Sequence, residues 1–179
     1  VATVVIDASE LGANQDAHVA SYVADAFKGL VITVNKWDLA RNFRIDKNKA
    51  IEIIRNRWRF ASYAPICFTS ALNKRGMKSL LETVERVYGE WTKGVPRYEL
   101  SRTIMNAVSD HPPSPVGRRS LKIYGVTQDD VAPPSFTFYV NRSDMVHFSY
   151  RRYLENSIRN IYGFEGCPLR MRFKGRRDN

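Results

Sequence analysis

The residues of this 179-residue chain best suited to recognition chemistry are Asn35-Lys36-Trp37-Asp38, which directly follow the apolar run of residues 30–34. An Asp carboxylate offers two acceptor oxygens, which match the N1–H and N2–H₂ donors that guanine has and adenine lacks. An Asn amide can bond a base and also brace a neighbouring loop, and a Lys stem can lie along a purine face while its ammonium stays in water. The tetrapeptide therefore predicts a guanine-binding loop, with Asn35, Lys36 and Asp38 as its contacts.

A second small loop supports this interpretation. The β-type run of residues 64–69 is followed at once by Ser70-Ala71-Leu72. Open α/β sheets bind ligands beyond the carboxyl ends of their strands, so we expect a backbone N–H of this loop to approach the guanine O6. The alternative for the first motif is an ordinary strand-to-loop turn in which Asp38 caps a helix.

The first half of the chain alternates between strand-like and helix-like patterns. The apolar spacing predicts strands over residues 1–6, 30–34 and 64–69, and helices over 15–27, 46–60 and 76–91, with Asp46 as the cap of the second helix. Alternation of this kind indicates a parallel sheet with helical crossovers. We therefore predict an α/β fold here.

The second half changes character after a short linker at residues 93–96. A helix is predicted over 98–109, strands over 121–127 and 136–140, a long helix capped by Asp144 up to about residue 162, and a last strand over 169–173. This α-β-β-α-β order is typical of a three-stranded sheet backed by helices. The predicted division is therefore 1–92 for the first domain, 93–96 for the linker and 97–179 for an α+β domain.

These motifs resemble those of a known family. Asn35–Asp38 and Ser70–Leu72 resemble the fourth and fifth guanine-specificity motifs of the translation-factor-related GTPases. The segments 148–156 and 163–166 resemble the last domain of the Der (EngA) double GTPases. The resemblance covers essentially the whole chain. It implies the C-terminal half of a second G domain, with a partial Ras-like P-loop GTPase sheet, followed by a KH-like domain.

The resemblance also implies ligands and partners. It implies GTP and GDP as the nucleotides, with Mg²⁺ bound in the parent protein through residues that this chain does not contain. It further implies a cytoplasmic role in assembly of the large ribosomal subunit. The expected partners are ribosomal RNA and the preceding G domain of the same parent.

Several elements of phosphate chemistry are missing from the sequence. There is no G-x-x-x-x-G-K-[ST] phosphate loop and no D-x-x-G after a strand. Phosphoryl transfer depends on such parts to position and stabilise charge, so we assign no catalytic residue and expect GTP hydrolysis only in the parent. A sheet that starts at residues 1–6 would also leave an apolar edge that another chain segment must cover.

The net charge of +10 is concentrated toward the C-terminal half, where the excess of Lys and Arg is larger in a shorter stretch. Such an excess indicates a polyanion partner, most naturally nucleic acid, although simple solubility is an alternative. The candidate RNA contacts are Arg118, Arg119, Lys122, Lys174, Arg176 and Arg177.

Gly163-Phe164-Glu165-Gly166 has the letters of the GXXG loop with which KH domains clamp a nucleic-acid backbone. That clamp requires a following helix whose free amides face a phosphate. Cys167-Pro168 and a strand pattern follow instead. We therefore predict a helix C-cap at Gly163 and a turn at Gly166.

The remaining composition restricts the class of protein. No apolar run reaches the roughly 18 residues of a membrane span. Two cysteines and three histidines show no ligand spacing, so no metal site is predicted, and the cysteine usage suits a reducing cytosol. Two alternatives stay open: an Era-like GTPase with a KH domain, and a non-enzymatic RNA-binding adaptor that lacks nucleotide binding.

Overall fold

The computed structural model describes residues 1–115 and 119–175, which form two compact units. The first unit contains Val1–Trp91 and also Phe164–Pro168, and the second contains Thr92–Gly163 and the chain from Leu169 onward. The division predicted from the sequence placed residues 164–168 in the second domain. Their contacts assign them to the first unit, because their backbone and side chains bond to residues of that unit.

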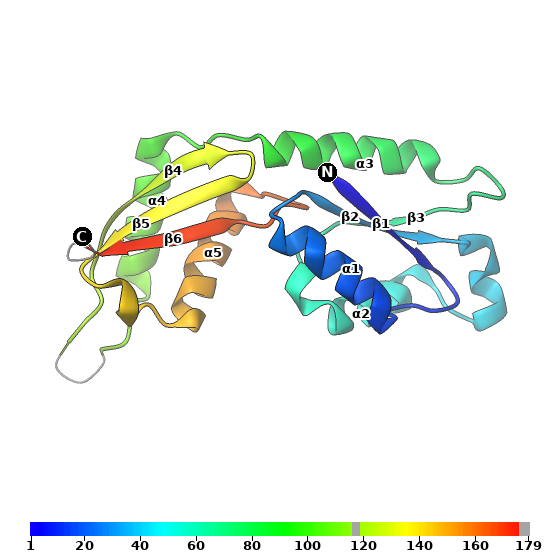
Figure 1. Cartoon of the computed structure of the whole chain (residues 1–179), viewed down its shortest axis with the longest axis horizontal. Helices are drawn as coiled ribbons and strands as arrows, with labels where there is room; N and C mark the ends of the chain where they lie inside the picture. Colours follow the sequence, from blue (N-terminus) through cyan, green and yellow to red (C-terminus); the bar gives the residue numbers. More distant parts are fainter. Residues whose placement is uncertain (116–118, 176–179) are drawn as a thin grey trace. The chain divides into compact units, whose positions relative to one another are not determined.

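The first unit is built on a parallel sheet, as predicted. Its strands are β1 (Ala2–Asp7), β2 (Leu30–Asn35) and β3 (Ile66–Phe68), in that spatial order (Figure 1). The helices are α1 (Asn14–Asp25), α2 (Lys47–Arg57) and α3 (Met77–Trp91), with short 3₁₀ segments η1 (Trp37–Phe43) and η2 (Arg59–Ala61). Since all three strands are parallel, their carboxyl ends lie at the same end of the sheet.

Helices cover both faces of the central strand. The helices α1 and α2 lie on one side of the sheet and α3 on the other (Figure 1). Every side chain from Leu30 to Val34 is buried. A parallel strand that is covered on both faces needs this continuous apolar run rather than an alternating one, which explains the pattern of residues 30–34.

The strand β1 lies at an edge of the sheet. Its Val4 and Ile6 are buried, whereas Val5 is 57% exposed on the opposite face. Val19 and Tyr22 on the neighbouring helix α1 are exposed as well. The edge strand therefore carries an exposed apolar residue, Val5, on the face that α1 does not cover, and exposed apolar residues also lie on the outer surface of α1.

The second unit has the predicted α-β-β-α-β order. Its elements are α4 (Arg97–Asp110), β4 (Ile123–Val131), β5 (Pro134–Val140), η3 (Ser143–Met145), α5 (Phe148–Tyr162) and β6 (Arg170–Gly175). The strand β5 pairs antiparallel with β4 and parallel with β6. The two long helices lie together on one face of this sheet (Figure 1), where Phe136, Phe138 and Leu154 are fully buried.

The start of the long helix differs from the prediction. Asp144 does not cap α5, because it lies in the separate segment η3 and its carboxylate pairs with Arg142 at 2.6 and 3.0 Å. The cap is His147, whose Nδ1 accepts from the Ser149 N–H. A Ser-Asp pattern indicates a helix start, but it cannot distinguish a short 3₁₀ turn from the α-helix that follows it.

No helix in the described parts of the chain is both long and apolar enough to cross a membrane.

The predicted cap of α2 is confirmed and allows a stability test. Asp46 Oδ1 accepts from the Lys49 N–H at 2.8 Å, which satisfies one of the free donors of the first turn. The substitution Asp46→Ala should therefore lower the free energy of unfolding by about 1 kcal/mol. Urea denaturation measures this change. Asp25→Ala, which removes an exposed carboxylate from the last turn of α1, serves as the control and should cost nothing.

Candidate functional site

The carboxyl ends of β2 and β3 bring the two predicted guanine-binding motifs together. Asn35 is the last residue of β2, and Ser70-Ala71-Leu72 follow β3. The Asn35 Oδ1 accepts a hydrogen bond from the Ala71 N–H at 3.0 Å and another from Thr69 Oγ1 at 3.3 Å. Asn35 thus braces the neighbouring loop, as its amide chemistry predicted.

Asp38 makes the second link between the motifs. Its Oδ1 accepts from the Ser70 hydroxyl at 2.5 Å, and the Ser70 oxygen in turn accepts from the Asn73 N–H at 3.2 Å. Asp38 is the second residue of η1, whose N-cap is Lys36, and it does not act as a helix cap. The alternative interpretation of Asp38 as a simple cap is therefore wrong. The residue stays exposed, so its carboxylate is open to a ligand.

The Ser70 loop is closed tightly. Ser70 and Arg75 exchange two backbone hydrogen bonds of 3.0 Å. Gly76 has a φ of +77°, and a Cβ at this position would lie 2.3 Å from the Phe68 carbonyl oxygen. Only glycine fits such an approach. Within this loop Leu72 is 84% exposed, so its side chain takes no part in packing.

The Ala71 N–H already has a hydrogen-bond partner within the site. The sequence predicted that a backbone N–H of this loop approaches the guanine O6. In the structure the Ala71 N–H donates to Asn35, so a bond to O6 has to share or replace this hydrogen bond. Asn35 therefore holds the backbone of this loop through its side-chain oxygen.

An ion pair that the sequence analysis missed completes the site. Lys36 adopts the left-handed conformation with a φ of 56°, and its ammonium lies 2.6 Å from Asp7 Oδ2. Asp7 also accepts from the Ser9 N–H and hydroxyl. The Lys36 and Ser9 bonds lower the pKa of Asp7 to about 2, and Asp7 raises the pKa of Lys36. The available signal was the position of Asp7 at the end of β1, opposite Asn35 in the register.

A pocket adjoins Asp38. Its volume is about 530 Å³, which is sufficient for a nucleobase. The Trp37 ring packs against Phe68 with centroids 4.4 Å apart at one side of this pocket, and Lys47 and Asp46 add charge to its lining. Among residues 1–115 and 119–175, no group of three or more His, Cys, Asp or Glu side chains is arranged to hold a metal ion.

The predicted RNA contacts fall into two sets. Arg118, Arg176 and Arg177 lie outside the described residues. Arg119, Lys122 and Lys174 are exposed residues of the second unit.

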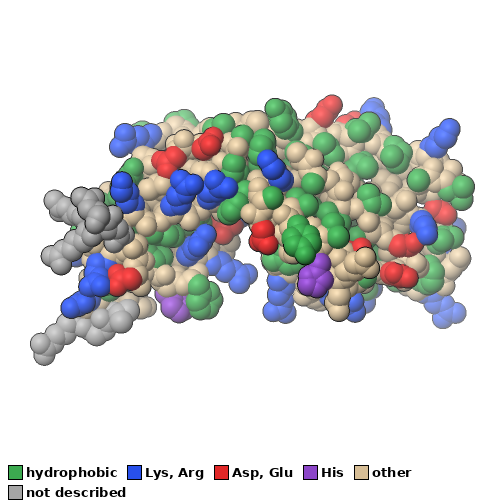
Figure 2. All heavy atoms as spheres, viewed as in Figure 1, with side chains coloured by type: hydrophobic (Ala, Val, Ile, Leu, Met, Phe, Trp, Pro, Cys, Tyr) green, Lys and Arg blue, Asp and Glu red, His purple; other side chains and the backbone are tan. Residues whose placement is uncertain are grey.

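The sheet of the second unit carries further basic residues. Arg172 on β6 lies two residues before Lys174 and is exposed, so both project from the same face of the strand. Lys174 is the register partner of the half-exposed Tyr139 on β5. Figure 2 shows Lys and Arg side chains gathered over this sheet. The basic and apolar alternation of residues 169–173 was the signal for Arg172.

The Gly163–Gly166 segment is not a GXXG clamp. Gly163 follows α5 with a φ of 83°, and its N–H donates to the Arg159 carbonyl at 2.8 Å. Gly166 also has a positive φ, and the strand β6 follows instead of a helix. The predicted C-cap and turn are confirmed.

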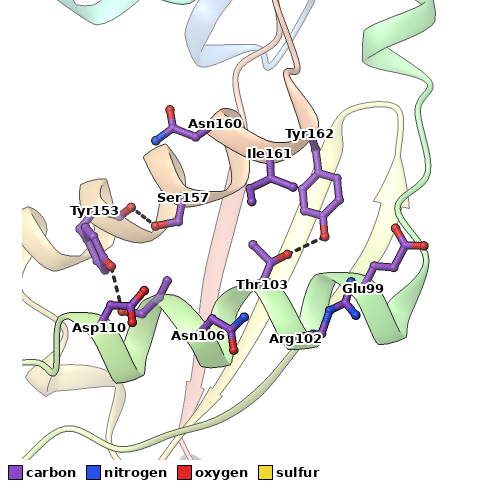
Figure 3. Close-up of a pocket in the computed structure, with 11 residues that line it drawn as sticks. Glu99, Arg102, Thr103, Asn106, Asp110, Tyr153, Ser157, Asn160, Ile161 and Tyr162 are labelled. Carbon is purple, nitrogen blue, oxygen red and sulfur yellow. Dashed lines mark hydrogen bonds between the residues drawn. The ribbon is translucent and has the colours of Figure 1, made fainter.

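A second groove lies between α4 and α5 in the second unit (Figure 3). Its volume is about 770 Å³. Thr103 bonds to the Tyr162 hydroxyl at 2.8 Å, and the Tyr153 hydroxyl donates to the Ala107 carbonyl at 2.8 Å. The sequence did not predict this groove, because polar residues on facing helices have the same pattern as residues that face solvent.

The observed fold and the family match agree on the class of protein. The α/β unit with a parallel sheet and the α-β-β-α-β unit after it define a partial G domain joined to a KH-like domain. Residues 95–174 match the family described as the KH-domain-like C-terminal domain of EngA bacterial GTPase enzymes.

Similar proteins cover nearly the whole chain. GTPase Der of Syntrophotalea carbinolica is 41% identical over 176 residues, which is 98% of this chain and 40% of the relative. GTPase Der of Alkaliphilus oremlandii is 43% identical over 171 residues, and that of Thermomicrobium roseum is 39% identical over 178. The chain is therefore similar to Der (EngA) GTPases over nearly its whole length. It spans about two fifths of the length of these relatives.

The Asp7 ion pair predicts a specific dependence of stability on pH. The pKa of Asp7 is about 2 in the folded chain and near 3.9 when unfolded, so the pair stabilises the fold above about pH 4. This stabilisation is lost as the pH falls toward 2. In Asp7→Asn the free energy of unfolding should therefore decline less steeply between pH 4 and pH 2, as measured by urea denaturation at a series of pH values. Asp25→Asn is the control, and a variant slope equal to that of the control would contradict the assignment.

Proposed function

We propose that this chain supplies the base-binding half of a guanine-nucleotide site in a protein that binds and hydrolyses GTP. The observation that carries the proposal is the pair of bonds, from Ala71 to Asn35 and from Ser70 to Asp38, that joins the two motif loops. The relatives named GTPase Der support the nucleotide and the reaction.

Each side chain has a role in this proposal. Asp38 accepts from the N1–H and N2–H₂ groups of guanine, which adenine cannot supply. Asn35 holds the Ala71 loop at the far edge of the base. The aliphatic stem of Lys36 lies along the purine face, while Asp7 holds its ammonium in place.

The remaining chemistry belongs to residues outside this chain. Phosphate binding, Mg²⁺ coordination and hydrolysis are assigned to the parent protein, so the 179-residue chain by itself should not hydrolyse GTP. The preceding G-domain segments of the same parent are the natural cover for the edge strand β1 and its exposed Val5.

Replacement of the discriminating carboxylate tests the proposal. In the full-length protein, Asp38→Asn should weaken GDP binding by about 100-fold, because charge-assisted hydrogen bonds to the base are lost. Xanthosine diphosphate should bind better to the variant than to the unchanged protein, since an amide N–H can donate to the carbonyl at C2 of xanthine. Isothermal titration with both nucleotides measures the change.

Asp25→Asn is the control, because it makes the same chemical change at an exposed residue of α1 that does not line this pocket. This variant should bind GDP like the unchanged protein. A GDP affinity of Asp38→Asn equal to that of the control would exclude the base-binding role. It would favour the alternative of an adaptor without nucleotide binding.

We further propose that the KH-like unit binds ribosomal RNA during assembly of the large ribosomal subunit in the cytoplasm. Arg172 and Lys174 project from one face of β6 beside Tyr139, which provides cations and an aromatic ring on one surface. An Era-like protein is less consistent with this chain, because the strand β6 and not a helix comes next after Gly166.

Charge reversal on this sheet should weaken RNA binding. The double substitution Arg172→Glu and Lys174→Glu should reduce the affinity for ribosomal RNA by about tenfold or more and lower the salt slope by roughly two contacts. Filter binding over a range of salt concentrations measures both quantities. Lys49→Glu with Lys78→Glu, on exposed positions of the first unit, makes the same change in net charge. Equal losses in the two double variants would show that only net charge matters and would refute the proposed surface.

A further inference from the structure

A short segment between α5 and β6, Phe164–Pro168, forms backbone hydrogen bonds at the amino end of the sheet of the first unit. Gly166 lies where β2 and the chain leading to β3 begin. Its carbonyl accepts from the Leu30 N–H at 2.7 Å, and its N–H donates to the Tyr63 carbonyl at 2.8 Å. The Gly166 peptide thus bridges the amino ends of the two strands.

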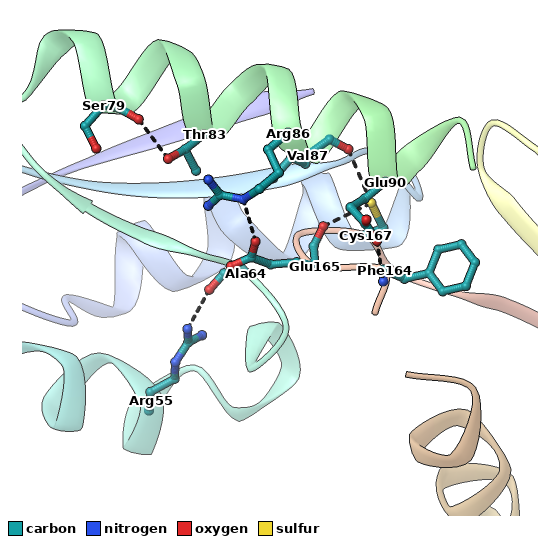
Figure 4. A network of polar contacts seen from close by, with 10 residues as sticks. All are labelled: Arg55, Ala64, Ser79, Thr83, Arg86, Val87, Glu90, Phe164, Glu165 and Cys167. Carbon is teal, nitrogen blue, oxygen red and sulfur yellow. Dashed lines mark hydrogen bonds and ion pairs between the residues drawn. The ribbon is translucent and has the colours of Figure 1, made fainter. Parts of the chain in front are cut away.

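The segment Phe164–Pro168 is anchored along α3 on several sides. The Phe164 N–H donates to the Glu90 carboxylate at 2.6 Å, and the Phe164 side chain is fully buried. Arg86 Nε donates to Glu165 at 2.9 Å, and the buried Cys167 thiol lies 3.6 Å from the Val87 carbonyl (Figure 4). Hydrogen bonds, an ion pair and apolar burial therefore hold the segment against α3.

The position of Gly166 accepts no side chain. Its φ is +73°, and a Cβ here would lie 2.5 and 2.7 Å from the two γ-carbons of Val87 and 3.2 Å from the Leu30 carbonyl oxygen. The neighbours are a packed side chain and backbone, which cannot move aside without a shift of α3 or β2. The fit depends on glycine for both space and conformation.

The other ends of the same two strands carry the base-binding residues. The strands β2 and β3 pair directly at only three positions, from Ile32 with Ile66 to Val34 with Phe68. Asn35 follows this short ladder on one strand, and Ser70 and Ala71 follow it on the other. Any change in the spacing of the strands at their amino ends therefore acts on the Asn35–Ala71 bond through a short, rigid ladder.

We propose that Phe164–Pro168 is a positioning segment that sets the spacing of β2 and β3 and thereby the geometry of the base-binding loops. The inference rests on the proposed function for its biological meaning. It makes the guanine site dependent on a segment that lies between α5 and β6 in the sequence. Gly166, Phe164 and Glu165 are positioning residues, since they act through the strands and not on the ligand.

Hydrogen exchange on the complete 179-residue chain, without nucleotide, tests the proposal. In Gly166→Ala the amides of Leu30 and Ala71 should exchange about tenfold faster or more, because both bonds depend on the spacing of the strands. The thermal midpoint of the first unit should fall by about 5 °C. Should Gly166→Ala fail to fold, Phe164→Leu gives the same readout with a milder change.

Gly12→Ala is the matched control. Gly12 also has a positive φ, of +74°, but a Cβ there would meet the flexible Arg57 side chain rather than the strands. The control should lower the thermal midpoint through backbone strain, while the Leu30 and Ala71 amides keep their protection. Faster exchange of these two amides in Gly166→Ala but not in Gly12→Ala supports the proposal.

Two results would overturn it. One is faster exchange confined to residues 164–168, and the other is an equal effect of Gly166→Ala and Gly12→Ala on Leu30 and Ala71. Neither measurement involves nucleotide, so failure here is distinct from failure of the base-binding role, which the GDP and xanthosine diphosphate affinities of Asp38→Asn decide.

Discussion

The pairing of β2 with β3 is the constraint on which the rest of the first unit depends. The strand β2 runs through the centre of the sheet with both faces covered, so it cannot shift without exposing Leu30 to Val34. At its carboxyl end Asn35 accepts from Ala71, and at its amino end Leu30 donates to Gly166. A single buried strand thus connects the candidate base-binding loops with the segment that fixes the other end of the sheet.

The charged groups around this strand hold positions more than they add stability. The Asp7–Lys36 and Arg86–Glu165 pairs are both partly exposed, and solvent screening leaves such pairs little effect on stability. What they provide is direction. The Lys36 backbone is left-handed, and the ion pair with Asp7 fixes the position of its ammonium group. Burial of β2 supplies the stability, and these polar contacts set the orientation of the side chains at its ends.

The sheet of the second unit has one buried face and one face with exposed residues. Its sheet buries Phe136 and Phe138 toward α4 and α5, whereas on the other face of β5 Tyr139 is exposed and Ser135 and Thr137 are buried. On β6 the exposed residues of that face are Arg172 and Lys174. The strand pattern that builds the core therefore also creates the basic surface, and no separate loop is needed to present it.

Much of this structure could be predicted from the sequence, because its signals are local. The apolar run of residues 30–34, the Asp46 cap and the α-β-β-α-β order each depend on neighbouring residues, and all were found as expected. The same holds for the placement of Asn35 and Ser70 at the ends of adjacent parallel strands. The predicted start of α5 was wrong, since a Ser-Asp pattern is compatible with both a 3₁₀ turn and an α-helix. The Asp7–Lys36 pair and the insertion of Gly166 beside Leu30 were decided only by the tertiary structure, because they join residues far apart in the chain, and no periodic pattern records which distant groups meet.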